Sequence, residues 1–274
     1  MKTINFLKGL IFSAILMSAL LSCTKEDFYP NSNGLLKKVK NGDYITEEIS
    51  YNNQNLISEV NSWSFWRKFY YNNQHQLIKE EIAANPAMLS SSTYSQNHEF
   101  VDPNKVGITM YCLFEYDNSG LFFRQLNYVP KDGQDELRSI ITFEYNDNNL
   151  IEKLLLHDGN TELTQFRTYQ YDSNSNVIEE DYYSYLFIPE GTGPKHLSKT
   201  TYEYDTYLNP FKIFEKSNGP GLFRNKNNIT KTTTINYYPS PGIAATMTSQ
   251  RSYEYNEDTG YPTRVVNGEE FIYE

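Results

Sequence analysis

The chain has 274 residues, which is long enough for one large domain or two domains of ordinary size. Its formal net charge is −10 and its isoelectric point is near 5.0, which argues against a nucleic-acid-binding protein, because affinity for phosphate backbones comes from Lys and Arg. Aromatic residues make up 15% of the chain, too many for a disordered acidic tail. With 24 Tyr, 16 Phe and 21% charged residues, the composition predicts a soluble protein rich in β-strands.

The first residues have the pattern of a secretory signal. Lys2 and Lys8 precede an apolar stretch, Leu10–Leu21, and the small residue Ser22 follows it. This stretch is too short to cross a bilayer, which takes about 20 apolar residues. The pattern therefore predicts export from the cytoplasm.

The end of this segment, Leu20-Leu21-Ser22-Cys23, resembles the bacterial lipobox. The resemblance implies a signal peptide at residues 1–22, lipidation of Cys23 and a lipidated tether over residues 23–34. Acyl chains on Cys23 would hold the protein on a membrane, since each buried CH₂ contributes about 0.8 kcal/mol. The alternative is cleavage near Ala19, which would leave a free thiol.

The next four residues, Thr24-Lys25-Glu26-Asp27, resemble the export signal of Bacteroidetes surface lipoproteins. This resemblance implies an outer-membrane lipoprotein exposed on the cell surface. The alternative is a solvated tether, with the protein facing the periplasm.

The chain contains two cysteines, Cys23 and Cys112. Lipidation of the first leaves no partner for an intramolecular disulfide and no cysteine-based metal site. We expect Cys112 to be a small buried apolar residue.

One short phrase recurs along the rest of the chain: an aromatic residue, any residue, Tyr, Asp or Asn, a few turn residues, and then an apolar return arm. Full copies begin at Phe69, Phe114, Phe143, Tyr169, Tyr202 and Tyr253, and weaker copies begin at Ile49 and Ile235. The predicted return arms begin at Leu56, Leu77, Leu121, Leu150, Val177, Phe211 and Thr263, while Leu35-Leu36 has the form of a return arm without an opening strand.

Each copy has the pattern of a β-hairpin. The two aromatic rings lie on one face of a strand because side chains alternate with period two, and the polar residue between them faces water. The Asp or Asn caps the turn through its side chain, and Asn or Gly in the loop tolerates a positive φ. No stretch after residue 23 shows a sustained helical period, so we expect little helix.

The phrase resembles the YD (RHS) repeat in degenerate form, and it is similar to an uncharacterised Bacteroidetes lipoprotein family with a porin-like β fold. We predict an all-β protein: an antiparallel up-and-down meander of about sixteen strands, rolled into a barrel-like or flattened closed sheet, since large open sheets curl or split. A β-sandwich is the alternative. Residues 35–274 would form a single repeat-built β domain, with an insertion loop near 83–105. The polar outer face argues against a lipid-exposed barrel.

The sequence offers little evidence for chemistry. None of the four histidines has a partner at a zinc-binding spacing, and we predict no metal and no cofactor. Asp172 opens a segment that imitates a calcium loop but lacks its Gly and Glu, so a capped turn is the better interpretation. Acidic clusters at Asp132/Asp135/Glu136 and Glu179/Glu180/Asp181 are the candidates for paired carboxylates of a glycoside hydrolase.

The copy at residues 63–71 departs from the pattern, because the face that is polar elsewhere carries Trp66, Lys68 and Tyr70. Exposed aromatic rings beside a cation make a platform for stacking sugar rings or for a protein partner. We therefore choose Trp66, Lys68 and Tyr70 as the candidate ligand-binding residues. The alternative is that the insertion loop folds over this strand and buries both rings.

Together these features predict a non-enzymatic binding module, anchored to the outer membrane through Cys23, that interacts with a glycan or an envelope protein and not with nucleic acid. Two alternatives remain: a structural component of an outer-membrane complex, and a carboxylate-based hydrolase.

Overall fold

The computed structural model describes residues 34–85, 99–186, 193–215, 224–237 and 245–274. The predicted signal peptide, Cys23, nearly all of the tether and the middle of the insertion loop lie outside the described residues. Residues 32–274 form one compact unit.

The described part of that unit contains seventeen strands and two short helical segments. The first nine strands are β1 (Leu36–Asn41), β2 (Tyr44–Tyr51), β3 (Ile57–Ser62), β4 (Phe65–Tyr71), β5 (Leu77–Ala84), β6 (Met110–Tyr116), β7 (Phe122–Val129), β8 (Glu136–Tyr145) and β9 (Ile151–Asp158). They are followed by β10 (Leu163–Tyr171), β11 (Val177–Ser184), β12 (Lys195–Leu208), β13 (Asn227–Asn236), β14 (Ala245–Gln250), β15 (Tyr253–Tyr255), β16 (Pro262–Val265) and β17 (Glu270–Tyr273). The helical segments are α3 (Pro103–Val106) and the 3₁₀ turn η2 (Pro210–Phe214).

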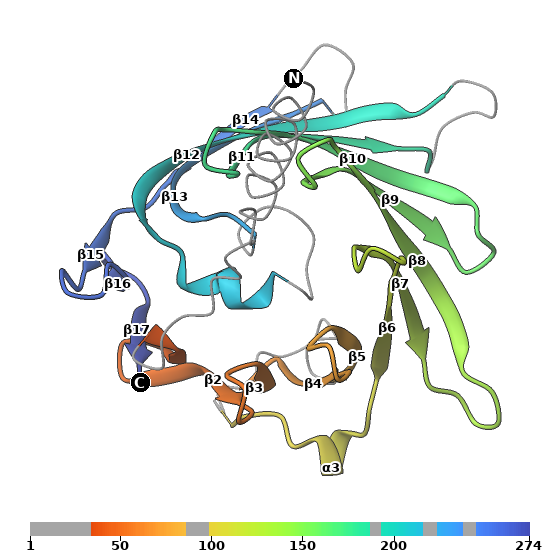
Figure 1. The fold of residues 1–274 in the computed structure, drawn as a ribbon, viewed down its shortest axis with the longest axis horizontal. Coiled ribbons are helices and arrows are strands. Elements are labelled where there is room, and N and C mark those ends of the chain that lie inside the picture. Colours follow the sequence, from red (N-terminus) through yellow and green to blue (C-terminus); the bar gives the residue numbers. More distant parts are fainter. Residues whose placement is uncertain (1–33, 86–98, 187–192, 216–223, 238–244) are drawn as a thin grey trace, which may run out of the picture. The chain divides into compact units, whose positions relative to one another are not determined.

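All of the strands belong to one antiparallel sheet, in which each strand pairs with the next along the chain up to β14 (Figure 1). Because β1 also pairs with β17, the sheet curves until its first and last strands meet. The predicted all-β meander is confirmed, with 17 strands where about sixteen were expected. A single sheet replaces the sandwich alternative.

The sheet is not closed into a barrel, and its ladders change between β14 and β15. The ladder on β13 ends with β14, and the ladder on β16 begins with β15, but no register joins β14 to β15. Only Arg251 and Ser252 separate these two strands in the chain. Between them, the backbone nitrogen of Arg251 donates to Thr230 of β13 and the carbonyl oxygen of Ser252 accepts from Val266 after β16, so the chain passes here from one ladder to the next. The predicted rolling of the sheet is therefore nearly complete.

The turns of the repeats are capped as predicted. The side-chain oxygen of Asp117, for example, accepts hydrogen bonds from the backbone nitrogens of Ser119 and Leu121, at 2.8 and 2.9 Å. The fourth position of the same turn, Gly120, has a positive φ. Equivalent caps are made by Asn52, Asn72, Asn146, Asp158 and Asp172.

A β-bulge precedes the second tyrosine of the repeats, and the sequence did not predict it. In the hairpin of β4 and β5, Tyr70 opposes Lys79 while Tyr71 opposes Leu77, so Ile78 is the extra residue. The bulge turns Tyr71 and Leu77 to the same face and leaves Ile78 exposed. The same register shift occurs before Tyr51, Tyr116, Tyr145, Tyr171, Tyr204 and Tyr255.

The motif tyrosines also connect one hairpin to the preceding one. The hydroxyl of Tyr51 donates a hydrogen bond to the carbonyl oxygen of Leu36, at 2.7 Å, and that of Tyr171 donates to Ile151, at 2.6 Å. Each acceptor lies at or near the start of an earlier strand, close to a bulge, where the ladder is irregular. We call these bonds tyrosine staples. Further staples join Tyr116 to Leu77, Tyr145 to Phe122, Tyr204 to Val177, Tyr253 to Ile229 and Tyr273 to Pro262.

The core lies on the concave face, where the aromatic residues of the repeats meet the first residues of the return strands. Phe122 packs between Phe114 and Phe143, with ring centroids 5.5 and 4.7 Å away. The same interior holds a buried ion pair between Arg67 and Glu80, whose side chains are 16% and 2% exposed. Cys112 is buried, as predicted, and burial raises the pKa of its thiol to about 12.

Two predicted arms are different in the structure. Phe211 does not begin a strand but lies in η2, inside the curve of the sheet (Figure 1), because Asn209 caps this turn and Pro210 cannot donate to a ladder. The strand that pairs with β12 is β13 instead. The return arm at Leu35-Leu36 finds its opening strand in β17, at the other end of the chain.

Candidate functional site

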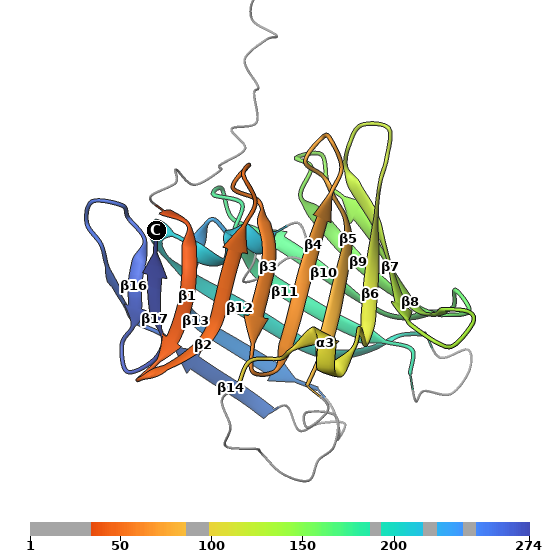
Figure 2. The same cartoon turned by 90° about the horizontal axis from the view of Figure 1, so that it is seen from below.

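The candidate site is a groove on the convex face of the sheet, between strands β3 and β4 and the segment 100–108 that crosses them (Figure 2). Its volume is about 690 Å³, within the usual range of ligand-binding sites. The backbone nitrogen of Val101 donates to the carbonyl oxygen of Ser62, at 3.0 Å, and this bond fixes the segment to the end of β3. The lining residues are Glu59, Asn61, Trp66, Lys68, Phe100, Val101, Asp102, Pro103, Asn104, Gly107 and Ile108.

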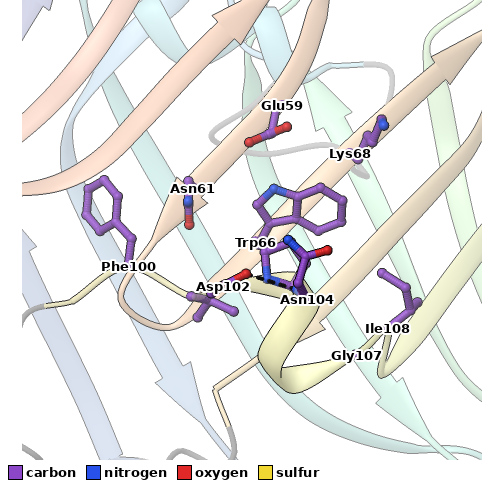
Figure 3. A pocket seen from close by; sticks show the side chains of 11 residues that line it. Glu59, Asn61, Trp66, Lys68, Phe100, Asp102, Asn104, Gly107 and Ile108 are labelled. Atoms are coloured by element: carbon purple, nitrogen blue, oxygen red, sulfur yellow. Dashed lines mark hydrogen bonds between the residues drawn. The ribbon is translucent and has the colours of Figure 1, made fainter.

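Trp66 forms part of the wall of this groove. Its side chain is 8% exposed and packs with Ala83 and Val101, while Val106 and Ile108 cover it further. The segment after β5 therefore buries this ring, so the expectation that Trp66 is exposed is wrong. The alternative, that both rings are buried, holds for Trp66 only, since Tyr70 stays half-buried. Figure 3 shows the indole ring between Glu59 and Asn104 at the groove.

The alternation of faces along β4 is as predicted. Phe65, Phe69 and Tyr71 belong to the main core, whereas Trp66 belongs to a separate apolar cluster on the other side of the sheet. On this outer face, the register of β3 and β4 places Asn61 opposite Trp66 and Glu59 opposite Lys68. Glu59 and Asn61 were missed at the level of sequence, although the alternation of β3 would have found them.

Polar groups surround the groove, and one of them is unsatisfied. The side-chain oxygen of Asn61 is buried and has no hydrogen-bond partner among the described residues. Buried acceptors in proteins are nearly always bonded, so this oxygen is an exception among the buried polar atoms of the sheet. Asp102 caps α3 by accepting from the backbone nitrogen of Asn104, at 3.0 Å, and this bond is drawn in Figure 3.

Lys68 and Tyr70 lie further along the same face of β4. Lys68 is exposed, and its Nζ lies 5.5 Å from the centroid of the Tyr70 ring. The Tyr70 hydroxyl donates to Glu81, at 2.5 Å. Partial burial and this bond raise the pKa of Tyr70 to about 12, so the phenol keeps its proton at neutral pH. Burial acts to raise the pKa of Glu81, but hydrogen bonds from Lys79 and Tyr70 outweigh it and the pKa is lowered.

The aromatic surface continues from Tyr70 across the next strands. The Nζ of Lys79 lies 5.7 Å from the Tyr70 ring and 5.1 Å from the Tyr111 ring. Tyr111 in turn stacks on Tyr128, with centroids 5.1 Å apart and planes 11° apart. We call Tyr70, Lys79, Tyr111 and Tyr128 the tyrosine strip. It was not predicted beyond Tyr70, because only the spatial order of the strands brings these rings together.

A second and smaller cavity of about 250 Å³ lies on the concave side, lined by residues that include Glu47, Trp63, Phe211 and Glu269. Burial raises the pKa of Glu47; the positive charge of Arg67 opposes this effect and the negative charge of Glu269 adds to it. These two carboxylates are not the ones that the sequence nominated.

One of the two nominated acidic clusters is divided by the fold. Along β11 the side chain of Glu180 is buried and pairs with Arg167, whereas its neighbours Glu179 and Asp181 pair across the strand with Lys199 and His196, each at 2.8 Å. Alternation therefore places these acids on opposite faces of the sheet. In the other cluster, Asp135 accepts a hydrogen bond from Tyr111, at 2.7 Å.

His75, His196 and the calcium-like loop all belong to turns or strands of the sheet. His75 occupies a turn with a positive φ, while His196 lies in β12 and stacks on Tyr183. Asp172 caps its turn by accepting from Asn174 and Asn176, as the capped-turn interpretation predicted. Within the ranges that the structure describes, no three His, Cys, Asp or Glu side chains come together as metal ligands. In the same ranges, no helix is long and apolar enough to cross a membrane.

The fold and the groove describe a repeat-built β protein with an outward-facing site. No protein-family model and no curated protein matches the sequence. Similar solved structures include porin-like proteins from Bacteroides vulgatus, at 10% identity and a TM-score of 0.38 over 88% of this chain and 99% of that one, and from Bacteroides uniformis, at 12% identity and a TM-score of 0.36 over 83% and 88%.

A further similar structure is the toxin complex TcdB2-TccC3, at 12% identity and a TM-score of 0.29. The match covers 77% of this chain, which spans only 10% of the toxin chain. At these TM-scores the similarities carry no argument about function, and none of them defines a family for this chain.

Proposed function

We propose that this protein is a non-enzymatic binding module of the bacterial envelope and that the groove on β3 and β4 binds a glycan. The observation that carries the proposal is the groove of about 690 Å³, whose wall combines the polar groups of Glu59, Asn61 and Asn104 with the ring of Trp66. Sugar hydroxyls both donate and accept hydrogen bonds, so they match carboxylate and amide groups of this kind.

The chemistry of the lining supports a sugar over other small ligands. Carboxylates and amides at Glu59, Asn61 and Asn104 alternate with the apolar surfaces of Trp66 and Ile108. A sugar ring has both polar edges and an apolar face, so it matches such a mixed wall better than a purely apolar ligand does. The adjoining tyrosine strip extends this surface, since the half-buried Tyr70 ring remains accessible beside Lys68.

The proposed location follows from the first residues of the chain. The lipobox resemblance at Leu20–Cys23 supports lipidation of Cys23, and Lys25-Glu26-Asp27 supports export to the cell surface. Labelling with a clickable fatty acid tests the anchor: we expect label on the wild type and none on Cys23→Ser. Protease accessibility on intact cells separates surface exposure from a periplasmic orientation.

The binding proposal is tested on a glycan array followed by calorimetry with the best glycan. We expect Asn61→Ala and Lys68→Ala each to weaken binding at least about fivefold, which corresponds to about 1 kcal/mol. Lys38→Ala on β1, a surface lysine that pairs with Glu48, is the matched control and should bind like the wild type.

Binding of no glycan, or full affinity in Asn61→Ala and Lys68→Ala, contradicts the proposal. Recovery of a stoichiometric protein partner in that situation would favour the structural component of an outer-membrane complex instead.

A further inference from the structure

The outer edge of β14 is unpaired in the part of the chain that the structure describes. β14 pairs with β13 over Ala245 to Gln250, and no described strand pairs with its other side. In Figure 2, β14 lies at the lower border of the sheet, beside β13 and away from β16 and β17. All six of its residues are exposed, and Met247 is 66% exposed.

The register shows which backbone groups are free. The backbone nitrogen of Arg251 donates to the carbonyl oxygen of Thr230, at 2.8 Å, so the backbone N–H of Arg251 faces β13. Because bonded and non-bonded pairs alternate in antiparallel ladders, Ser249 and Met247 also face β13. The N–H and C=O groups of Thr246, Thr248 and Gln250 therefore point away from β13.

β14 lacks the features that protect exposed edges. Natural edge strands carry charges, proline or bulges that prevent pairing with another chain. The sequence of β14, Ala-Thr-Met-Thr-Ser-Gln, has no charge and no proline, and its pairing with β13 runs without a bulge. An open edge of this kind accepts an additional strand through its main chain.

We propose that β14 pairs antiparallel with β14 of a second copy of this chain, so that the two sheets become continuous. Residues whose backbone N–H and C=O groups point away from β13 must lie opposite each other in the two copies. The symmetric register that meets this condition places Thr248 opposite Thr248 and Thr246 opposite Gln250 of the other copy. On the opposite face, Met247 lies against Ser249 of the other copy. No charged residue of β14 meets another, although the whole chain carries a net charge of −10.

A six-residue edge buries less area than a standard protein interface, so the dimer is weak and depends on concentration. This inference is separate from the proposed function, because β14 is not among the strands that form the groove.

The test uses the full chain in a non-ionic detergent, with mass measured by sedimentation velocity over a range of concentrations from about 5 to 500 μM. The wild type and Thr248→Ala, which keeps both backbone groups, should form dimers as the concentration rises. Thr248→Pro removes an outward N–H without removing a bond to β13 and should shift the association at least about tenfold to higher concentration.

Charge variants test the register without altering the backbone. Thr248→Lys places two like charges directly opposite each other, and so does Thr248→Glu, so each variant alone should be monomeric. An equimolar mixture of the two should recover the dimer. A mixture that stays monomeric overturns the symmetric register.

Amide hydrogen exchange supplies the second measurement. The amides of Thr246, Thr248 and Gln250 should exchange several-fold more slowly at high than at low protein concentration, while those of Met247 and Ser249 should not change. The proposal is overturned if the wild type stays monomeric, if the dimer persists in Thr248→Pro and Thr248→Lys, or if the edge amides are protected to the same degree at every concentration.

Discussion

The tyrosine staples should carry a measurable share of the stability, and Tyr51→Phe tests one of them. The substitution keeps the ring, including its contact with Lys37, whose Nζ lies 4.9 Å from the ring centroid, and removes only the hydroxyl. What is lost is the hydrogen bond to the carbonyl oxygen of Leu36, a residue with 0% exposure.

The expected cost follows from the burial of the acceptor. A typical internal hydrogen bond contributes about 1 kcal/mol, and leaving a buried acceptor without a partner costs about 1–3 kcal/mol. We therefore expect Tyr51→Phe to lower the free energy of unfolding by about 2 kcal/mol. For a domain of this size, this corresponds to a fall in melting temperature of roughly 4–8 °C.

The measurement is urea denaturation followed by tyrosine fluorescence and circular dichroism. Tyr111→Phe is the matched control, because its hydroxyl donates to Asp135 at the surface and water can replace the bond. We expect the control to lose no more than about 0.5 kcal/mol. Equal losses in the two variants would refute the idea that the staples stabilise the sheet through a buried acceptor.

Three further predictions concern stability. Arg67→Met leaves the carboxylate of Glu80 buried without its cation, and we expect urea denaturation to show a loss of about 3–5 kcal/mol. Thr161 has a φ of +72°, so Thr161→Gly relieves backbone strain. We expect the free energy of unfolding to rise by about 1 kcal/mol and the melting temperature to rise with it. The pKa of Glu47 is raised above its ordinary value of 4.5 in the folded state, so folding favours the protonated side chain. The stability that this gives is complete below pH 4.5 and is lost as the pH rises through the raised pKa. Glu47→Gln should therefore be more stable than the wild type at pH 7 and equal to it at pH 4, as followed by denaturation at both values.

Each of these predictions has a control or an outcome that contradicts it. Arg124→Met breaks a half-exposed pair with Glu115 and should cost less than about 1 kcal/mol; a similar cost at Arg67 would mean that burial of its partner is unimportant. Thr161→Ala keeps a side chain at the positive φ and should not stabilise the protein. A pH-independent difference between Glu47→Gln and the wild type would contradict the pKa argument.

Local pattern was sufficient to predict most of the fold. The aromatic-x-Tyr phrase placed the strands, and the Asp or Asn after it placed the caps, because both depend on residues close together in the chain. The bulges were not predictable in this way. Pairs such as Leu77-Ile78 and Val177-Ile178 have the pattern of a continuous apolar strand, although the second residue of each is the exposed residue of a bulge.

The candidate site was only partly predictable. Alternation along β4 correctly separated Trp66 from Phe69, but the exposure of Trp66 depends on Val101 and Ile108, which follow the middle of the insertion loop. Nothing in the local sequence shows that this segment returns across β3. The predicted closed sheet implied that its first and last strands meet, but the register of β1 with β17 could not be predicted, since a long-range contact leaves no local pattern.

The pairing of β1 with β17 has a consequence for the order of assembly during synthesis. Strand β1 is among the first described segments to leave the ribosome, but one of its two neighbours consists of Glu270–Tyr273, which is among the last. Until those residues emerge, one edge of β1 has no strand to pair with, and the curved sheet cannot close there. The pairing of β1 with β17 is therefore a late step between residues far apart in the chain. Before it occurs, the unpaired edge of β1 exposes the nascent chain to aggregation with other chains.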